Sequence, residues 1–399
     1  MRVAVCDAIL LRLYGVQGAQ AGGWPVQSDS DESRTLENKM TVNRWIFGVV
    51  VVTGMVICTQ LEAQVKGDQD ITGPYEVVED WLQPLPWHAD GWTFGLVAAV
   101  YPDNPNRIFV LQGGDLPDPR PPRGPGPQSN SNHTPEHFIL VLNSDGELIE
   151  SWTQWDHLFV RPHKVTINPY DPERHVWIVD DWASQIFKFT NDGSELVMTL
   201  GEREVTGDDE NHFARPTDMA FLPDGTFFVS DGYVNSRVVK FNKDGEFLMQ
   251  WGSSGTGPGQ FTLVHSVKVD ADRRVYVADR RNGRIQIFDE NGRFLDMWDG
   301  MAQPSHIVVA QDQTVWMSDP TLNRLVQFNL TGLRLTHWGV AGSFPGAFSN
   351  PHHFDVDEDG NLYVADYANY RVQKFVPKPD ADPRRLIQPA FVSVNTPLN

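Results

Sequence analysis

The chain has 399 residues, is 40% hydrophobic and carries a formal net charge of −20 at pH 7. Nucleic-acid phosphates require a basic footprint and a polybasic membrane contact requires clustered Lys and Arg, so this charge argues against both kinds of partner. The length fits one repeat domain of ~300 residues with a leader, and the 33 glycines and 28 prolines favour the many turns of a β-rich chain.

Residues 1–63 have the character of a leader. Met40–Arg44 gives a short basic start, an apolar run follows from Trp45 to Cys58, and the small residue Ala63 ends the segment. This order is typical of a secretory signal peptide, and the run is short for a membrane span, although an N-terminal anchor stays open as the alternative. We therefore expect translation to start at Met40, the protein to be secreted or periplasmic, and no stable membrane insertion after signal cleavage.

Five segments between 175 and 375 repeat one pattern. Each has an alternating apolar strand that ends in Asp, a tight loop, an Arg or Gln, and a second strand that ends in Phe. The strand-ending acids are Asp180, Asp231, Asp279, Asp319 and Asp366. Hairpin signals such as Asp244-Gly245 follow, because glycine supplies the positive φ of a two-residue turn. Four short strands recurring every ~40–50 residues indicate a propeller blade, here of NHL type, in which the Asp and Arg bridge strand ends without a catalytic role.

An irregular sixth unit precedes these five. Its strands lie within 95–111 and 137–152, and a Pro-, Gly- and Arg-rich insertion at 113–136 separates them, which we expect to cover one end of the ring. Residues 75–80 supply a fourth strand for the last unit, so that the ring closes without a long open edge. The sequence therefore predicts an all-β, six-bladed β-propeller of NHL-type repeats over 74–378, with a C-terminal tail at 379–399, as a monomer.

The residue just before the first strand of each blade should face the central channel. From the second blade onward these residues are His163, Thr217, His265, His306 and His352. Alternate blades thus supply His163, His265 and His352, and three His with one open position form a catalytic Zn²⁺ arrangement. For any one of them, a hydrogen bond to a neighbour or to water is the alternative. His306 is left as a fourth ligand, a proton shuttle or a bystander, and strand alternation should turn His353 away from the ligand position.

Four motifs are more specific than a generic repeat. They are Pro216-Thr-Asp218, Ser230-Asp-Gly-Tyr-Val-Asn-Ser-Arg237, Pro258-Gly-Gln-Phe261 and Ala278-Asp-Arg-Arg-Asn-Gly-Arg284. Together they resemble the peptidylamidoglycolate lyase family, and the similarity runs from roughly 95 to 375. The resemblance implies a six-bladed propeller that cleaves a peptidyl-α-hydroxyglycine to a peptide amide and glyoxylate, at a central Zn²⁺ held by three histidines.

The resemblance also implies roles for single residues. His163, His265 and His352 match the zinc ligands. Tyr233 matches the catalytic tyrosine that takes the hydroxyl proton of the substrate, and a nearby metal and arginine should lower its pKa for that role. Arg280 matches an active-site arginine suited to a carboxylate or to a phenolate. The alternative for Tyr233 is a turn aromatic that packs on the neighbouring blade.

Three positions depart from the family pattern. The first-blade arginine of the family corresponds to Gly113, and Arg120 or Arg123 of the insertion is the candidate to reach over in its place. The Met two residues before the last zinc ligand is Asn350, which stays an auxiliary candidate. The Asp that holds a structural Ca²⁺ in the family is His353, so calcium is not expected.

The expected function is a secreted Zn²⁺-dependent lyase that cleaves the N–C bond of a peptidyl-α-hydroxyglycine-type carbinolamide, in a small-molecule or peptide substrate. Two alternatives stay open. One is a non-catalytic NHL propeller that binds protein or glycan, and the other is a metal-dependent hydrolase or lactonase on the same fold. The hydrolases of this kind usually have carboxylate and Asn ligands, so three His favour the lyase.

Overall fold

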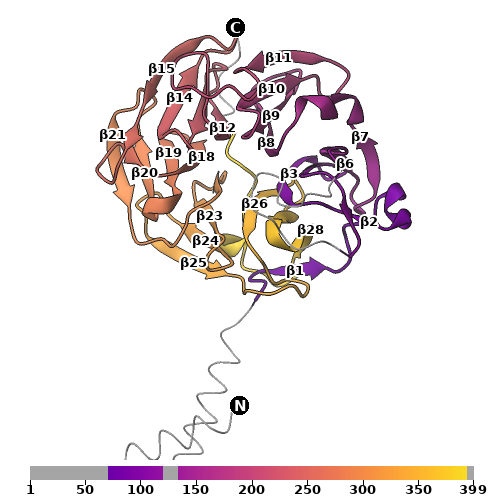
Figure 1. Cartoon of the computed structure of the whole chain (residues 1–399). Helices are drawn as coiled ribbons and strands as arrows, with labels where there is room; N and C mark the ends of the chain where they lie inside the picture. Colours follow the sequence, from indigo (N-terminus) through magenta and orange to yellow (C-terminus); the bar gives the residue numbers. More distant parts are fainter. Residues whose placement is uncertain (1–70, 120–133, 393–399) are drawn as a thin grey trace, which may run out of the picture. The chain divides into compact units, whose positions relative to one another are not determined.

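The computed structural model describes residues 71–119 and 134–392, and within them the chain forms a ring of six four-stranded antiparallel sheets (Figure 1). The predicted six-bladed propeller is confirmed. The predicted signal peptide and the two arginines of the insertion, Arg120 and Arg123, lie outside the described residues. In the part of the chain that is described, no helix has both the length and the apolar character needed to cross a membrane.

Each blade is one sheet whose strands follow the chain from the central channel outward, except that the outer strand of the sixth blade comes from the N-terminal end. The first blade contains β3 (Val97–Asn104), β4 (Arg107–Gln112), β6 (Ile139–Leu142) and β7 (Leu148–Ser151). The second contains β8 (Pro162–Ile167), β9 (Val176–Asp180), β10 (Gln185–Phe189) and β11 (Leu196–Leu200). The third contains β12 (Pro216–Phe221), β13 (Phe227–Asp231), β14 (Arg237–Phe241) and β15 (Phe247–Trp251).

The remaining blades have the same order. The fourth contains β18 (Val264–Val269), β19 (Val275–Asp279), β20 (Arg284–Phe288) and β21 (Phe294–Trp298). The fifth contains β22 (Ile307–Val309), β23 (Val315–Asp319), β24 (Arg324–Phe328) and β25 (Arg334–Trp338). The sixth contains β26 (Pro351–Val356), β27 (Leu362–Asp366), β28 (Arg371–Pro377) and β1 (Tyr75–Val78).

Short elements connect the blades. They are β2 (Trp92–Thr93), β5 (Leu116–Pro117), β16 (Ser253–Ser254), β17 (Gln260–Phe261), and the 3-10 helices η1 (Pro86–Asp90), η2 (Thr153–Leu158), η3 (Arg280–Asn282), η4 (Tyr367–Asn369) and η5 (Pro383–Arg385).

The ring is closed by the N-terminal strand. β1 pairs antiparallel with β28, in a register that sets Tyr75 opposite Pro377 and Val78 opposite Lys374. The sixth blade is therefore built from both ends of the propeller, as the sequence predicts. Because this pairing supplies the outer strand of the last blade, the ring has no open seam.

The core consists of six apolar clusters, and each lies between two neighbouring blades. The tryptophan that ends an outer strand packs on the hairpin glycine of the next blade. At Gly193 (φ 68°), a Cβ would lie 2.3 Å from the Trp152 ring, and at Gly292 (φ 77°) it would lie 2.8 Å from the Trp251 ring. Glycine is therefore required at this hairpin position for two reasons: the backbone is left-handed, and a Cβ would collide with the tryptophan ring.

The strand-ending acids have the predicted structural role. Asp231 accepts from Arg237 Nε at 2.9 Å, and Asp279 accepts from Arg284 Nε at 2.8 Å. The other oxygen of Asp231 accepts from the Ala214 amide, which precedes the first strand of its blade. Each acid thus fixes the loop that leads into the channel to the strand ends beside it.

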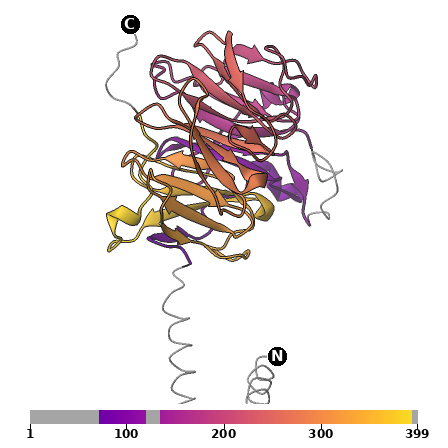
Figure 2. The same ribbon diagram turned by 90° about the vertical axis from the view of Figure 1, so that its left-hand side faces the viewer.

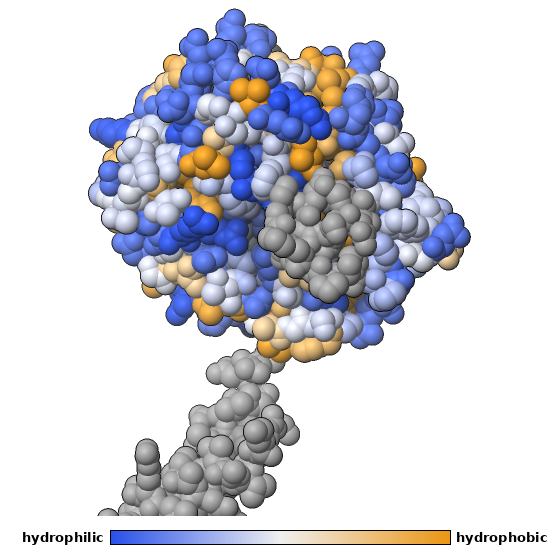
Figure 3. All heavy atoms as spheres, viewed as in Figure 1, coloured by the Kyte–Doolittle hydropathy of each residue, from blue (hydrophilic) through white to orange (hydrophobic). Residues whose placement is uncertain are grey.

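The described part of the predicted C-terminal tail packs on the propeller. The Ile387 amide donates to the Tyr75 hydroxyl at 2.8 Å, and the Phe391 amide donates to the Val309 carbonyl at 2.8 Å. This segment lies at the end of the channel where the inner strands finish, opposite the end where they begin (Figure 2). The face seen in Figure 3 is largely hydrophilic, and its apolar side chains are scattered instead of forming one continuous patch.

Candidate metal centre and active site

A bulge at the start of the inner strands turns side chains into the channel. The register shifts between Pro162 and Lys164, between Val264 and Ser266, and between Pro351 and His353, so the residue in between is unpaired. These unpaired residues are His163, His265 and His352. A bulge re-aims a side chain, and here it directs three imidazoles toward the axis.

The fifth blade differs from the prediction. Ser318, which precedes the strand-ending Asp319, exchanges backbone hydrogen bonds with Ser305 and His306, and β22 begins only at Ile307. The residue equivalent to the bulged histidines is therefore Ser305, and His306 lies one position deeper in the channel. Choosing His306 for this position was wrong by one residue, because the sequence pattern does not mark the bulge.

The three predicted ligands meet around the axis. Ligand nitrogens of His163, His265 and His352 lie within 4.8 Å of one another, and all three residues are buried. The ring centroids are 5.1 Å apart for His163 and His265, 4.8 Å for His163 and His352, and 5.1 Å for His265 and His352. The three rings therefore form a nearly equilateral group supplied by alternate blades.

Each of the three imidazoles donates its Nδ1 proton to a backbone carbonyl of the next blade. His163 donates to Thr217 at 2.8 Å, and His265 donates to Ser305 at 3.0 Å. His352 donates to the Ala98 carbonyl at 2.7 Å. A carbonyl can only accept, so the tautomer is fixed and each Nε2 presents a lone pair to the channel.

The three imidazoles are held in the neutral form. Burial lowers the pKa of His163, His265 and His352 well below the usual histidine value, and nearby positive charges act in the same direction. Neutral imidazole with a free Nε2 is the form that binds a metal. The donor set therefore fits a cation such as Zn²⁺.

Tyr233 lies directly beside this group. Its hydroxyl oxygen is 3.1 Å from His163 Nε2 and 3.0 Å from His265 Nε2. The hydroxyl has one proton, and both nitrogens are acceptors, so one of the two contacts is not a hydrogen bond. At least one Nε2 lone pair in the site therefore has no proton to accept, and a bound cation could take that lone pair.

The backbone before Tyr233 requires glycine. A Cβ at Gly232 would lie 1.9 Å from the Val264 carbonyl oxygen, so no other residue fits between the third and fourth blades. The Tyr233 amide donates to the Arg215 carbonyl at 3.2 Å, which holds the loop over the channel. The pKa of Tyr233 is raised by burial, and Arg161 and Arg280 oppose that effect only in part. The lowered pKa expected from the sequence therefore depends on the charge of a bound cation.

Two loops equivalent to that of Tyr233 carry Arg280 and Tyr367. The Arg280 amide donates to the Leu263 carbonyl at 2.8 Å, and the Tyr367 amide donates to the Asn350 carbonyl at 3.1 Å. Among residues 71–119 and 134–392, the half-buried Arg280 side chain makes no hydrogen bond or ion pair, so its guanidinium is available to a ligand. The Tyr367 ring lies 5.2 Å from the His352 ring and was not foreseen from the sequence.

Two further arginines flank Tyr233. Arg161 and Arg215 both bond the buried carboxylate of Asp181, with Arg161 Nε at 2.8 Å and Arg215 Nη2 at 2.6 Å. The Arg215 guanidinium lies 4.5 Å from the centre of the Tyr233 ring, and that of Arg161 lies 5.7 Å from it. Sequence reasoning missed this cluster, although Arg-Pro precedes both His163 and the equivalent Thr217.

The remaining candidates have different surroundings. The amide oxygen of Asn350 is buried without a hydrogen-bond partner in the described chain, and its backbone has a φ of 66°. His353 does not join the three-histidine group, but it faces the channel, because the bulge breaks the alternation: its Nδ1 donates to the Ala98 carbonyl at 2.9 Å. At Gly113, the atoms nearest to a Cβ would be those of Leu96, at 3.7 Å or more, so a Cβ fits there.

Comparison with known proteins gives these features a context. A family model described as a 6-bladed β-propeller (DUF5128) matches residues 206–296, and the NHL repeat model matches residues 348–375. The chain is 30% identical over 264 residues to NHL repeat-containing protein 3 of Mus musculus, covering 60% of this chain and 72% of that protein. It is 31% identical over 280 residues to peptidyl-α-hydroxyglycine α-amidating lyase 1 of Drosophila melanogaster, covering 63% of this chain and 51% of that protein. The chain belongs to the family of NHL-repeat propellers, and it is similar in sequence to the peptidyl-α-hydroxyglycine α-amidating lyases.

The similarity extends to larger proteins and to a solved structure. The chain is 32% identical over 275 residues to peptidyl-glycine α-amidating monooxygenase B of Xenopus laevis, covering 64% of this chain and 30% of that protein. It thus spans about a third of the length of that relative. A solved streptogramin B lyase superposes with a TM-score of 0.52 at 11% identity, over 76% of this chain and 98% of that one, and shares the fold. The relatives include proteins named as lyases and proteins named only for their repeats, so the similarity alone does not decide between a lyase and a non-catalytic propeller.

Proposed function

We propose that this propeller is a secreted, Zn²⁺-dependent lyase that cleaves peptidyl-α-hydroxyglycine-type carbinolamides to an amide and glyoxylate. One observation carries the proposal: three neutral imidazoles present their Nε2 lone pairs to one point, directly beside the Tyr233 hydroxyl. A propeller that only binds protein or glycan has no need for three tautomer-fixed histidines around a buried phenol. The lyases among the relatives support the reaction class.

The residues that would hold the metal are His163, His265 and His352. Three His with one open position suit a catalytic Zn²⁺, and the hydrogen bonds from Nδ1 to backbone carbonyls are the outer contacts that orient such ligands. When bound, the ion would supply Lewis acidity to the hydroxyl oxygen of the substrate and lower the pKa of nearby acids.

The arginines would bind the substrate carboxylate. Arg280 is half-buried and has no hydrogen bond or ion pair within the described residues, so it can form a bidentate pair with a carboxylate. Arg161 and Arg215 are partly neutralised by Asp181 and add positive charge on the other side of Tyr233. They take the part of the family's first-blade arginine, which is Gly113 here.

Tyr233 would move the proton. As the phenolate, which the charge of a bound cation would favour, it would take the proton of the substrate hydroxyl; the C–O bond then becomes a carbonyl, and the C–N bond breaks with its electron pair left on nitrogen. The same proton then passes from Tyr233 to that nitrogen, so the amide and glyoxylate form with no net gain or loss of protons. The positive charge of the Arg215 guanidinium, which lies over the ring, would stabilise the phenolate in this transfer.

The decisive experiment combines metal analysis with a turnover assay. The protein is purified without a His tag, its bound metals are measured, and glyoxylate release from α-hydroxyhippurate is followed. The proposal expects one Zn²⁺ per chain and glyoxylate release that disappears with chelator and returns with Zn²⁺. Bound zinc without glyoxylate release would reject the substrate class, and the absence of any bound metal would reject the mechanism.

A second candidate is a non-catalytic NHL propeller, and two observations favour it. The position of the family's first-blade arginine is Gly113, and NHL repeat-containing protein 3, a relative named only for its repeats, is matched over most of its length. This candidate predicts that the channel binds no metal and that Tyr233→Phe changes nothing measurable in the assay above.

A further inference from the structure

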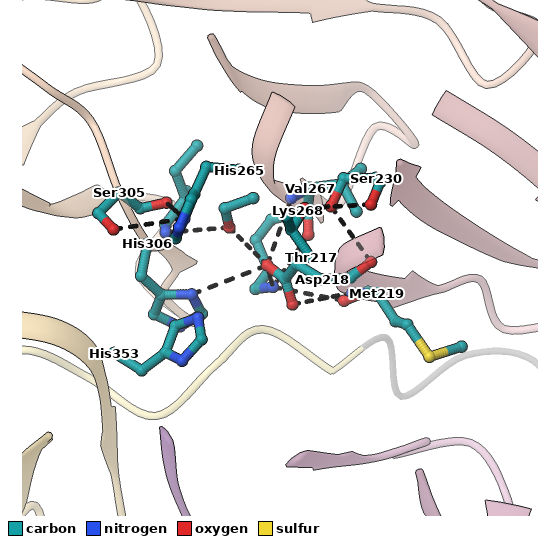
Figure 4. Close-up of polar contacts among 12 residues, drawn as sticks. Thr217, Asp218, Met219, Ser230, His265, Val267, Lys268, Ser305, His306 and His353 are labelled. Atoms are coloured by element: carbon teal, nitrogen blue, oxygen red, sulfur yellow. Dashed lines mark hydrogen bonds and ion pairs between the residues drawn. The ribbon is translucent and has the colours of Figure 1, made fainter. Parts of the chain in front are cut away.

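Below the three-histidine site, the channel contains a second layer of polar side chains. These side chains come from the residues that follow the bulge: Lys164, Asp218, Ser266, His306 and His353. His306 and His353 lie against one another with ring centroids 4.6 Å apart, and His306 faces Asp218 (Figure 4). This layer separates the three-histidine site from the opposite end of the channel.

One charge pair in this region is fully satisfied. Asp218 Oδ2 accepts from Ser266 Oγ at 2.5 Å, from the Val267 amide at 3.3 Å and from the Lys268 ammonium. Lys268 also donates to the carbonyls of Met219 and Val267. Asp218 and Lys268 therefore have no need of another partner, and they account for the dashed contacts at the centre of Figure 4.

Three other buried groups lack such partners within residues 71–119 and 134–392. Lys164 is 2% exposed and makes no hydrogen bond or ion pair there. Asp355 is 8% exposed, and one carboxylate oxygen accepts from the Val356 amide at 2.8 Å while the other has no partner in that range. Neither ring nitrogen of the fully buried His306 has a hydrogen bond, and its nearest carboxylate, Asp218, is 3.7 Å away.

These groups line one cavity of about 260 Å³ at the end of the channel opposite the three-histidine site. Its polar wall contains the three groups without partners, Lys164, Asp355 and His306, and also the exposed Glu358. Four further charged groups in the wall are already paired or hydrogen-bonded: Lys268, Arg174, Asp103 and Asp357. Apolar side chains complete it, among them Val308 and Phe391, the latter from the C-terminal segment that packs across this face. The cavity is thus polar on one side and apolar on the other.

The charges limit what this cavity can bind. The cations Lys164, Lys268 and Arg174 disfavour a metal ion, and the carboxylates Asp355, Asp357 and Glu358 disfavour a polyanion. Burying a charge without a partner is unfavourable, so a lysine and an aspartate that both line one cavity, farther apart than an ion pair, favour a ligand that spans them. Such a ligand carries one negative and one positive group together with a small apolar part.

We propose that this end of the channel binds a small zwitterion of the α-amino-acid class. The ligand's carboxylate pairs with Lys164 and accepts from His306, its ammonium group pairs with Asp355, and its side chain lies against the apolar wall. The site is independent of the proposed lyase reaction, because none of its three polar groups belongs to the three-histidine site.

Isothermal titration calorimetry on the full-length protein tests the proposal. Glycine, L-alanine and L-leucine are titrated, with acetate and methylammonium as probes that carry only one of the two charges. We expect saturable binding of at least one amino acid below about 10 mM, and binding of the single-charge probes weaker by at least about tenfold. No saturable heat for any amino acid, or acetate binding equal to theirs, would overturn the proposal, and this comparison needs no variant.

Variants then locate the binding. Lys164→Met and Asp355→Asn should each weaken amino-acid binding by at least about tenfold, whereas Lys243→Met, which removes an exposed lysine paired with Asp244, should leave it unchanged. Circular dichroism checks that each variant folds. His163→Ala should retain the binding. Unchanged affinity in both channel variants, or its loss in His163→Ala, would place the ligand elsewhere and refute this site.

Discussion

Replacing Tyr233 with phenylalanine separates catalysis from stability. The Tyr233 hydroxyl lies 3.1 and 3.0 Å from two imidazole nitrogens but can donate to only one of them, so Tyr233→Phe removes a single hydrogen bond. A typical net contribution of such a bond to folding is about 0.5–1.5 kcal/mol. The same oxygen is the proposed proton acceptor, and loss of a positioned acid or base lowers turnover by about 10²–10⁴-fold.

A matched tyrosine elsewhere in the ring shows the opposite effect. The Tyr276 hydroxyl is buried and donates to the Asp270 carboxylate at 2.9 Å, near the end of β19 opposite the one that leads to Arg280. A hydrogen bond to a charged group contributes about 1.5–3 kcal/mol, which for roughly 300 ordered residues corresponds to a fall in Tm of about 2–5 °C. Tyr276→Phe should therefore lower Tm and leave kcat nearly unchanged.

The assay follows glyoxylate release from α-hydroxyhippurate at saturating Zn²⁺, with calorimetric melting of the same samples and measurement of bound metal. We expect Tyr233→Phe to retain its zinc and its Tm to within about 2 °C while kcat falls by at least about 10²-fold. A Tyr233→Phe variant with bound zinc and wild-type kcat would refute the role of Tyr233 as the proton carrier.

Three further outcomes follow from the same site. In melting scans, Zn²⁺ at about 100 times its Kd should raise Tm by about 4 °C. The rise should vanish in His163→Ala but persist in His337→Ala, which replaces an exposed histidine. Asp181→Asn releases Arg161 and Arg215 from the carboxylate that holds them. The KM for α-hydroxyhippurate should rise by about tenfold, and the KM for its uncharged ester should rise less. Equal effects on both compounds would contradict carboxylate binding by these arginines. Gly113→Arg adds an arginine at the first-blade position, and because Arg161 and Arg215 already take that part, kcat/KM in steady-state kinetics should change by less than about threefold; a gain of about tenfold or more would mean that those two arginines do not fill the role.

The repeat pattern predicted the fold because its signals are local. Alternating apolar residues, the strand-ending Asp and the Asp-Gly hairpins each specify a few neighbouring residues, and six such units can bury their faces only against one another. Even ring closure was predictable, since the alternation of residues 75–80 supplies the one strand that the last blade lacks. The hairpin glycine recurs visibly in the sequence, but its contact partner does not, because the contact between Trp152 and Gly193 joins two different blades.

The three histidines were predictable for the same reason. The wrong position given to His306 came from a β-bulge, a structural feature that the sequence pattern does not mark. A bulge adds one residue at the start of most inner strands, so counting along the chain assigned His306 to a position that belongs to Ser305. The same bulge lets His352 and His353 both face the channel, although strict alternation would separate them.

The sequence by itself determined the six-bladed NHL propeller, the three histidines from alternate blades, and Tyr233 and Arg280 as their neighbours. Only the tertiary structure decided how these groups act on one another. It gives each Nδ1 a carbonyl acceptor from the next blade, sets Arg161 and Arg215 on Asp181 beside Tyr233, and leaves Lys164 and Asp355 unpaired in one cavity. The physical reason is that hydrogen bonds and burial depend on groups brought together by ring closure, and residues from different blades meet at the axis regardless of their distance along the chain.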